Sequence, residues 1–92
     1  MKKGEFIIWD SHFGYDIGFY SKEEGVMYGT SEIYLVTGVS EGFLSVPPHE
    51  IHSFSKELIE KLNTKYKYKR EYETLLERLN IRKQRVLNEE IK

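Results

Sequence analysis

The stretch GVSEGFLSVPPHEI, residues 38–51, decides how the first half of the chain folds. Its apolar segment FLSV, residues 43–46, has the composition of a short strand and runs directly into two prolines. Pro47 has no N–H to donate, so it ends a strand or stands at a sheet edge. Pro48 has a backbone angle that suits the first position of a 3₁₀ turn. The stretch therefore predicts a strand, a stop and a single turn, with Ile51 buried at its end.

Further short strands are expected on both sides of this stretch. They are GEFIIWD (4–10), YDIGFYS (15–21), EIYLVTGV (32–39) and HSF (52–54), separated by turn clusters at 11–14, 22–25, 29–31 and 40–42. In the second strand Tyr15, Ile17 and Phe19 alternate with polar or small residues, which is typical of a sheet. Gly18 within it indicates a bulge or a close backbone approach. Closely spaced short strands predict a small antiparallel barrel or sandwich.

The order of these segments resembles the SH3-like small β-barrel. The resemblance covers residues 3–54 and lies in KKGEFIIW, DIGFY, a tight hairpin and EGFLSVPPHEI. It implies a five-stranded barrel over residues 1–54 but no particular activity, because this fold carries many functions. Peptide-binding SH3 domains use an acidic loop and an aromatic cluster; the ALYDY start of that family is absent here, which argues against proline-rich ligands. The matching candidates for a partner-binding face are Trp9, Tyr15, Tyr20, Glu23, Glu24 and Tyr28.

The second part of the chain, residues 55–92, is predicted to be helical. Ser55 is a candidate N-cap, and apolar residues then recur at helical spacing as far as Tyr66, with a break or a continuation after Asn63. A second apolar stripe over residues 69–91 predicts another helix. We expect it to pack back on residues 55–66 as a hairpin or against a second chain, forming a homo-oligomer.

Composition bounds the class of protein. The 92 residues contain 39% hydrophobic and 32% charged residues and no cysteine, which excludes disulfides and thiolate metal sites. No apolar run approaches the roughly 20 residues that a membrane-spanning helix needs, and no signal-peptide pattern follows Met1. We therefore expect a cytoplasmic protein that does not contact a membrane.

Charge is distributed unevenly between the two parts. Residues 1–54 carry three Lys and eight Asp or Glu, whereas residues 55–92 carry eleven Lys or Arg and seven Glu. The string KYKYKR, residues 65–70, interleaves cations with aromatic rings, as nucleic-acid-binding surfaces do. Its alternative interpretation is a solvated helix face. The candidate nucleic-acid contacts are Lys65, Lys67, Lys69, Arg70, Arg78, Arg82, Lys83 and Arg85.

Two polar clusters are candidate sites of chemistry. His49 and His52 lie three residues apart, but they follow two prolines and have no third ligand nearby in sequence, so a structural turn is favoured over a metal site. Asp10, His12 and Asp16 cluster at a turn without a nucleophile or a phosphate-binding loop, which favours a solvated turn. We therefore expect no catalytic residue, no metal and no cofactor.

The leading hypothesis is a non-enzymatic protein-interaction module, and the alternative is a nucleic-acid-binding protein. Thirteen aromatic residues exceed what so small a core holds, which leaves some for a binding face. The chain also has no alanine, a composition typical of an AT-rich coding genome. Together these features suggest a small phage or mobile-element accessory protein that binds and modulates a host or defence protein.

Overall fold

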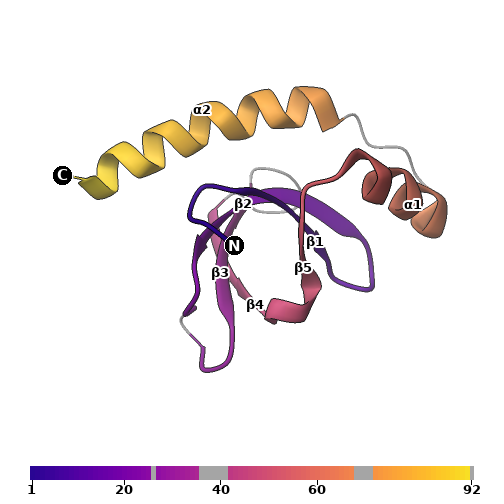
Figure 1. Ribbon diagram of the computed structural model, residues 1–92, viewed down its shortest axis with the longest axis horizontal. Helices are drawn as coiled ribbons and strands as arrows, with labels where there is room; N and C mark the ends of the chain where they lie inside the picture. Colours follow the sequence, from indigo (N-terminus) through magenta and orange to yellow (C-terminus); the bar gives the residue numbers. More distant parts are fainter. Residues whose placement is uncertain (26, 36–41, 68–71, 92) are drawn as a thin grey trace.

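The computed structural model describes residues 1–25, 27–35, 42–67 and 72–91 and has an α+β fold. Five antiparallel strands form one curved sheet, and two helices follow at the C-terminal end (Figure 1). The elements are β1 (Phe6–Asp10), β2 (Tyr15–Lys22), β3 (Ser31–Leu35), β4 (Gly42–Val46), the 3₁₀ turn η1 (Pro48–Glu50), β5 (Ile51–Ser53), α1 (Lys56–Tyr66) and α2 (Tyr72–Ile91).

The strand order is β4-β3-β2-β1-β5, so the last strand pairs with the first. Among the described residues no pairing joins β4 to β5, and the sheet is open; the predicted closed barrel is wrong. The reason lies in the proline stretch. Pro47 ends β4, and η1 carries the chain to the opposite edge of the sheet, where β5 has only three residues for pairing.

Each face of the sheet carries a buried apolar cluster. On the inner face of the curve, Ile7, Ile33 and Leu35 pack together; Tyr20, Val46 and Ile51 complete this cluster. On the outer face, Ile17 and Phe19 pack with Ile59 of α1 and Leu79 of α2. The predicted alternation along β2 is confirmed, since Tyr15, Ile17 and Phe19 all belong to the outer cluster and Tyr20 to the inner one. The helices therefore share a core with the strands.

Helix α1 begins where the sequence predicts. The backbone N–H of Leu58 donates to Ser55 Oγ at 3.3 Å, which is an N-cap. The helix continues past Asn63 to Tyr66, and Lys67 ends it in a left-handed conformation with its N–H bonded to the Asn63 carbonyl. Of the two alternatives, continuation is thus confirmed over this stretch.

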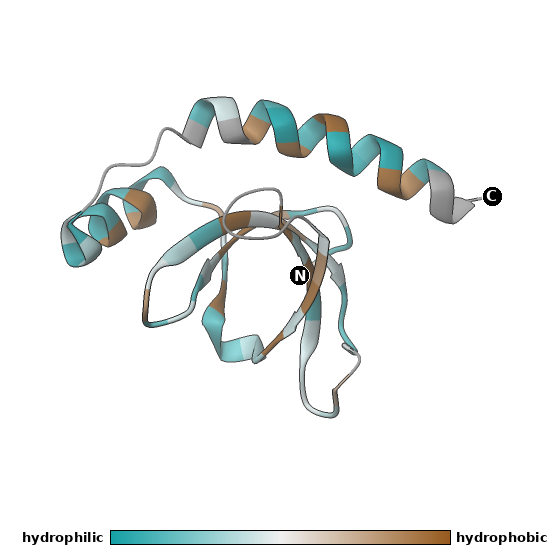
Figure 2. Cartoon of the chain, turned by 180° about the vertical axis from the view of Figure 1, so that it is seen from behind, coloured by the Kyte–Doolittle hydropathy of each residue, from teal (hydrophilic) through white to brown (hydrophobic). Residues whose placement is uncertain are grey.

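Helix α2 lies across the outer face of the sheet, over β2 (Figure 1). Leu79 is completely buried there, and Leu76 and Val86 are partly buried beside it. Figure 2 shows apolar segments on the side of α2 that faces the sheet. The sequence predicts that residues 69–91 pack as a hairpin on residues 55–66 or against a second chain. Among the described residues α2 packs instead on the strands, where it covers the apolar outer face of the sheet. Self-association through residues 69–91 stays a prediction.

Gly18 permits a close approach between two strands. A Cβ atom at this position would lie 2.2 Å from the carbonyl oxygen of Tyr34 on β3. Of the two alternatives from the sequence, close approach is confirmed at Gly18, and the irregularity in register lies further on, between Tyr20 and Lys22.

Neither described helix combines the length and apolar character that crossing a bilayer requires.

Candidate functional site

The β2–β3 hairpin borders a groove of about 830 Å³. We call it the hairpin groove. Its floor includes Tyr20, which is 8% exposed, and Ile51 at the start of β5; Pro48 of η1 also lines it. Its other lining residues are Met1, Glu23, Glu24, Gly25, Met27, Tyr28, Gly29, Thr30 and Ser31. The groove thus joins the hairpin to the proline turn, two segments far apart in sequence.

Hydrogen bonds hold the hairpin that presents these side chains. The N–H of Gly25 donates to the Thr30 carbonyl at 2.8 Å, and the N–H of Thr30 donates to the Met27 carbonyl at 3.2 Å. The Ser31 hydroxyl donates to the Glu23 carbonyl at 3.1 Å. These bonds join the two arms of the hairpin, whose tip presents Met27 and Tyr28 to solvent. A bonded hairpin loses less conformational entropy on binding than a free loop.

The groove is acidic at the end of β2. The Glu23 and Glu24 side chains are exposed and line it directly. Nearby Glu32 is instead engaged within the fold, because it accepts from the Ser21 hydroxyl at 2.9 Å and lies 3.9 Å from the Lys22 ammonium. The exposed pair therefore provides negative charge toward a ligand, beside an exposed phenol ring.

Four of the six predicted partner-binding residues meet in this groove, namely Tyr20, Glu23, Glu24 and Tyr28. Tyr15 lies elsewhere: it is 2% exposed in the helix-facing cluster, and its hydroxyl donates to Asn63 Oδ1 at 2.5 Å. Trp9 packs against the inner cluster and is also absent from the groove lining. Alternation separates the two faces of a strand but does not reveal which face a helix will cover.

Sequence reasoning missed the other eight groove residues, among them the apolar Met27, Pro48 and Ile51. Met27 lies between the predicted turns at 22–25 and 29–31, where an apolar side chain is expected to be exposed. The sequence could therefore have identified Met27 as a candidate. The contribution of η1 could not be identified in this way, since it depends on β5 pairing with β1 across the sheet.

The predicted nucleic-acid residues divide into engaged and exposed groups. Lys65 lies 3.5 Å from Asp10 and over the Tyr66 ring, and Lys83 lies 4.5 Å from the centre of the Phe6 ring. Arg82 is half-buried. Lys67, Arg78 and Arg85 are exposed, and Lys65 is exposed as well despite its contacts, while Lys69 and Arg70 lie outside the described residues. Some of the described basic side chains are therefore engaged in contacts within the chain, and only part of the set is exposed for binding a nucleic acid.

Asp10 fastens α1 to the turn after β1. It accepts hydrogen bonds from the Tyr66 hydroxyl and, at 3.1 Å, from the His12 N–H. Burial raises the pKa of Asp10, but these bonds and the Lys65 ammonium outweigh it and hold the pKa below its usual value. The bond to Asp10 also raises the pKa of Tyr66. These contacts give Asp10 a structural role within the trio Asp10, His12 and Asp16.

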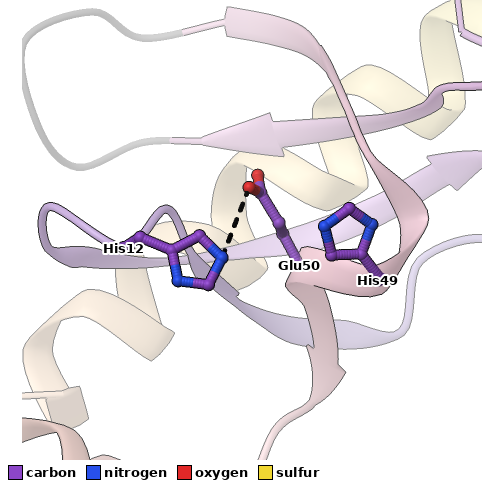
Figure 3. Close-up of side chains that lie close together, drawn as sticks. All are labelled: His12, His49 and Glu50. Atoms are coloured by element: carbon purple, nitrogen blue, oxygen red, sulfur yellow. Dashed lines mark ion pairs between the residues drawn. The ribbon is translucent and has the colours of Figure 1, made fainter.

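A second polar cluster joins the same turn to η1. His12 Nε2 lies 3.8 Å from Glu50 Oε2, and His49 is adjacent (Figure 3). One ligand atom from each of the three residues lies within 4.8 Å of the others. Antiparallel pairing of β1 with β5 explains this meeting, because Trp9 stands opposite Ile51 and so the end of β1 adjoins the start of β5. The sequence suggested His52 as the neighbour of His49, whereas the structure supplies His12.

Comparisons with protein-family models, curated proteins and solved structures find no match to this chain. The hairpin groove and the cluster of His12, His49 and Glu50 are therefore the features from which a function can be inferred.

Proposed function

We propose that the chain is a non-enzymatic protein-interaction module that binds a partner segment in the hairpin groove. The observation that carries the proposal is the meeting of two exposed carboxylates with Tyr28 and Met27 on a hydrogen-bonded hairpin. Aromatic and Met side chains are enriched at protein interfaces, and here they line a groove that a partner segment can fill.

The chemistry of the groove favours a basic, extended partner segment with one apolar side chain. Glu23 and Glu24 attract a Lys or Arg, while Tyr20 and Ile51 offer an apolar floor. A volume of about 830 Å³ is in the range of pockets that enclose a small ligand or a few side chains. A segment of a few residues is therefore the matching size of ligand.

The SH3-like relationship is part of this proposal and concerns the fold only. Its support is the one-turn helix η1 standing directly before the last strand, at the place where the resemblance expects it. An accessory role for phage or mobile elements, acting on a host or defence protein, is supported by the alanine-free composition. Such a protein needs a binding surface and no catalytic centre.

The test begins with a pull-down from nuclease-treated lysate, followed by titration of the purified partner. Tyr28→Ala and the double variant Glu23→Lys, Glu24→Lys are compared with Phe13→Ala. Phe13 is a matched control because it is 97% exposed but is not part of the groove lining. We expect the groove variants to weaken binding at least about tenfold, the effect of losing a central interface contact, and the control to leave it unchanged.

Two results would overturn the proposal. In the first, Phe13→Ala weakens binding as much as Tyr28→Ala, which places the interface outside the groove. In the second, capture is lost with nuclease and with the double variant Arg78→Gln, Arg85→Gln. That second result favours the nucleic-acid alternative, whose affinity falls steeply with salt.

A further inference from the structure

We propose that His12, His49 and Glu50 form a binding site for a divalent transition metal, with Zn²⁺ as the best-matched ion. We call this set the histidine cluster. It uses none of the groove-lining residues, so it stands independently of the proposed protein-binding function.

The spacing of the three ligand atoms is close to that of a metal site. Zn²⁺ bonds of about 2.1 Å in tetrahedral geometry place neighbouring ligand atoms roughly 3.4 Å apart. The separation between His12 Nε2 and Glu50 Oε2 is 3.8 Å, and the whole set lies within 4.8 Å. Both histidines are exposed, so their side chains can rotate to close the remaining gap of roughly an ångström.

The carboxylate is already oriented for this role. Trp9 Nε1 donates to Glu50 Oε1 at 3.0 Å, which leaves Oε2 directed toward His12 (Figure 3). Carboxylates that ligate metals are themselves held by hydrogen bonds from neighbouring groups, as Glu50 is here. The indole thus gives the cluster a fixed element that scattered surface acids lack.

Two backbone devices hold the histidines in place. Pro48 begins η1, and the Glu50 N–H donates to the Pro47 carbonyl at 3.0 Å, so His49 and Glu50 occupy a closed turn. His12 has φ of 71°, a left-handed conformation that few non-glycine residues adopt, and its N–H is bonded to Asp10. The two segments therefore meet with limited freedom.

The ligand types select the class of ion. Two imidazoles and one carboxylate suit Zn²⁺, Co²⁺, Ni²⁺ or Cu²⁺, whereas Ca²⁺ and Mg²⁺ prefer sets of oxygen ligands. Three protein ligands leave a fourth position for water at this exposed site. A bound ion would join the turn after β1 to η1 and thereby stabilise the end of the sheet.

The test uses untagged protein freed of metal with a chelator, titrated with Zn²⁺ against a chromophoric competitor and with Co²⁺ by visible absorption. Trp9 is the only tryptophan and contacts Glu50, so its emission gives a second readout. We expect one ion per chain and a melting temperature raised by about 11–22 degrees when the ion is in hundredfold excess over its Kd.

The variants His12→Asn and His49→Gln should each weaken binding at least about tenfold, while circular dichroism stays unchanged. Asn is chosen at position 12 because it tolerates a left-handed backbone. His52→Gln is the matched control, since His52 is exposed and close in sequence but lies outside the cluster. Absence of saturable binding would overturn the proposal, and so would equal losses in the control and in the cluster variants.

Discussion

Replacing Leu79 with Ala tests whether α2 belongs to the core of a single chain. Leu79 is completely buried between α2 and the sheet, in a cluster with Ile17, Phe19 and Ile59. Its truncation removes three carbon atoms from a site where two strand residues and one helix residue converge. Buried Leu→Ala changes cost about 2.7–5 kcal/mol, and the lower end applies where neighbours can partly close the cavity.

We therefore expect a loss of about 3 kcal/mol in the free energy of unfolding, since one side of the cavity is a surface helix that can shift inward. For a domain of this size that loss lowers the melting temperature by about 12–24 degrees. Ile81 on the same helix is the matched control, because it is 62% exposed. Ile81→Ala should change stability by no more than about 0.5 kcal/mol, helped by the higher helix propensity of Ala.

Urea unfolding followed by circular dichroism measures both variants, and the wild type is repeated over a hundredfold range of protein concentration. Equal effects of Leu79→Ala and Ile81→Ala would refute the packing of α2 on the sheet. A wild-type urea midpoint that rises with protein concentration would also refute this packing. Such a rise indicates an oligomer, in which α2 packs against a second chain.

Three further outcomes are expected. Gly18→Ala should cost about 3 kcal/mol in urea unfolding, because its Cβ would meet a backbone oxygen of Tyr34 at 2.2 Å that cannot move without breaking the sheet; an unchanged midpoint would contradict this. The pKa of Asp10 is lowered by folding, so its carboxylate stabilises the fold above its unfolded pKa of about 3.9, and that stability is lost as pH falls through the folded pKa. Thermal melts should therefore show wild type exceeding Asp10→Asn at about pH 7 and the difference shrinking toward about pH 3, whereas a constant difference would argue against the linkage. Ser55→Ala should lower the free energy of unfolding by about 1 kcal/mol, because the Leu58 N–H loses its cap; an unchanged urea midpoint of the helical circular-dichroism signal would exclude that cap.

Local chemistry made much of this fold predictable. Alternation identified the two faces of β2, the missing N–H of Pro47 marked the end of β4, and Ser55 marked the start of α1. Each of these signals acts over a few residues, where side-chain type and backbone angle are directly linked.

Long-range pairing was the part that the sequence could not supply. Whether the sheet closes depends on where η1 delivers β5, and that strand pairs with β1 alone among the described strands. The same pairing brings His12 to His49, 37 positions away, which no spacing rule anticipates. The burial of Tyr15 depends on α1, and in particular on Asn63, which lies 48 positions away. The local pattern around Tyr15 carries no sign of this contact, so it places Tyr15 wrongly on a binding face.

The turn η1 connects the two proposed sites, since Pro48 lines the hairpin groove while His49 and Glu50 belong to the histidine cluster. A bond from Glu50 N–H to Pro47 makes these three residues one closed unit, so they do not move independently. A metal ion can then affect the groove through Pro48 and through Ile51, which directly follows Glu50 and also lines the groove. Thermodynamic reciprocity requires the reverse effect as well. If the ion changes the partner's affinity through Pro48 or Ile51, the partner changes the ion's affinity by the same factor. A partner held only by Tyr28 and the acidic pair would leave that affinity unchanged, so metal titration with and without partner distinguishes which wall of the groove the partner uses.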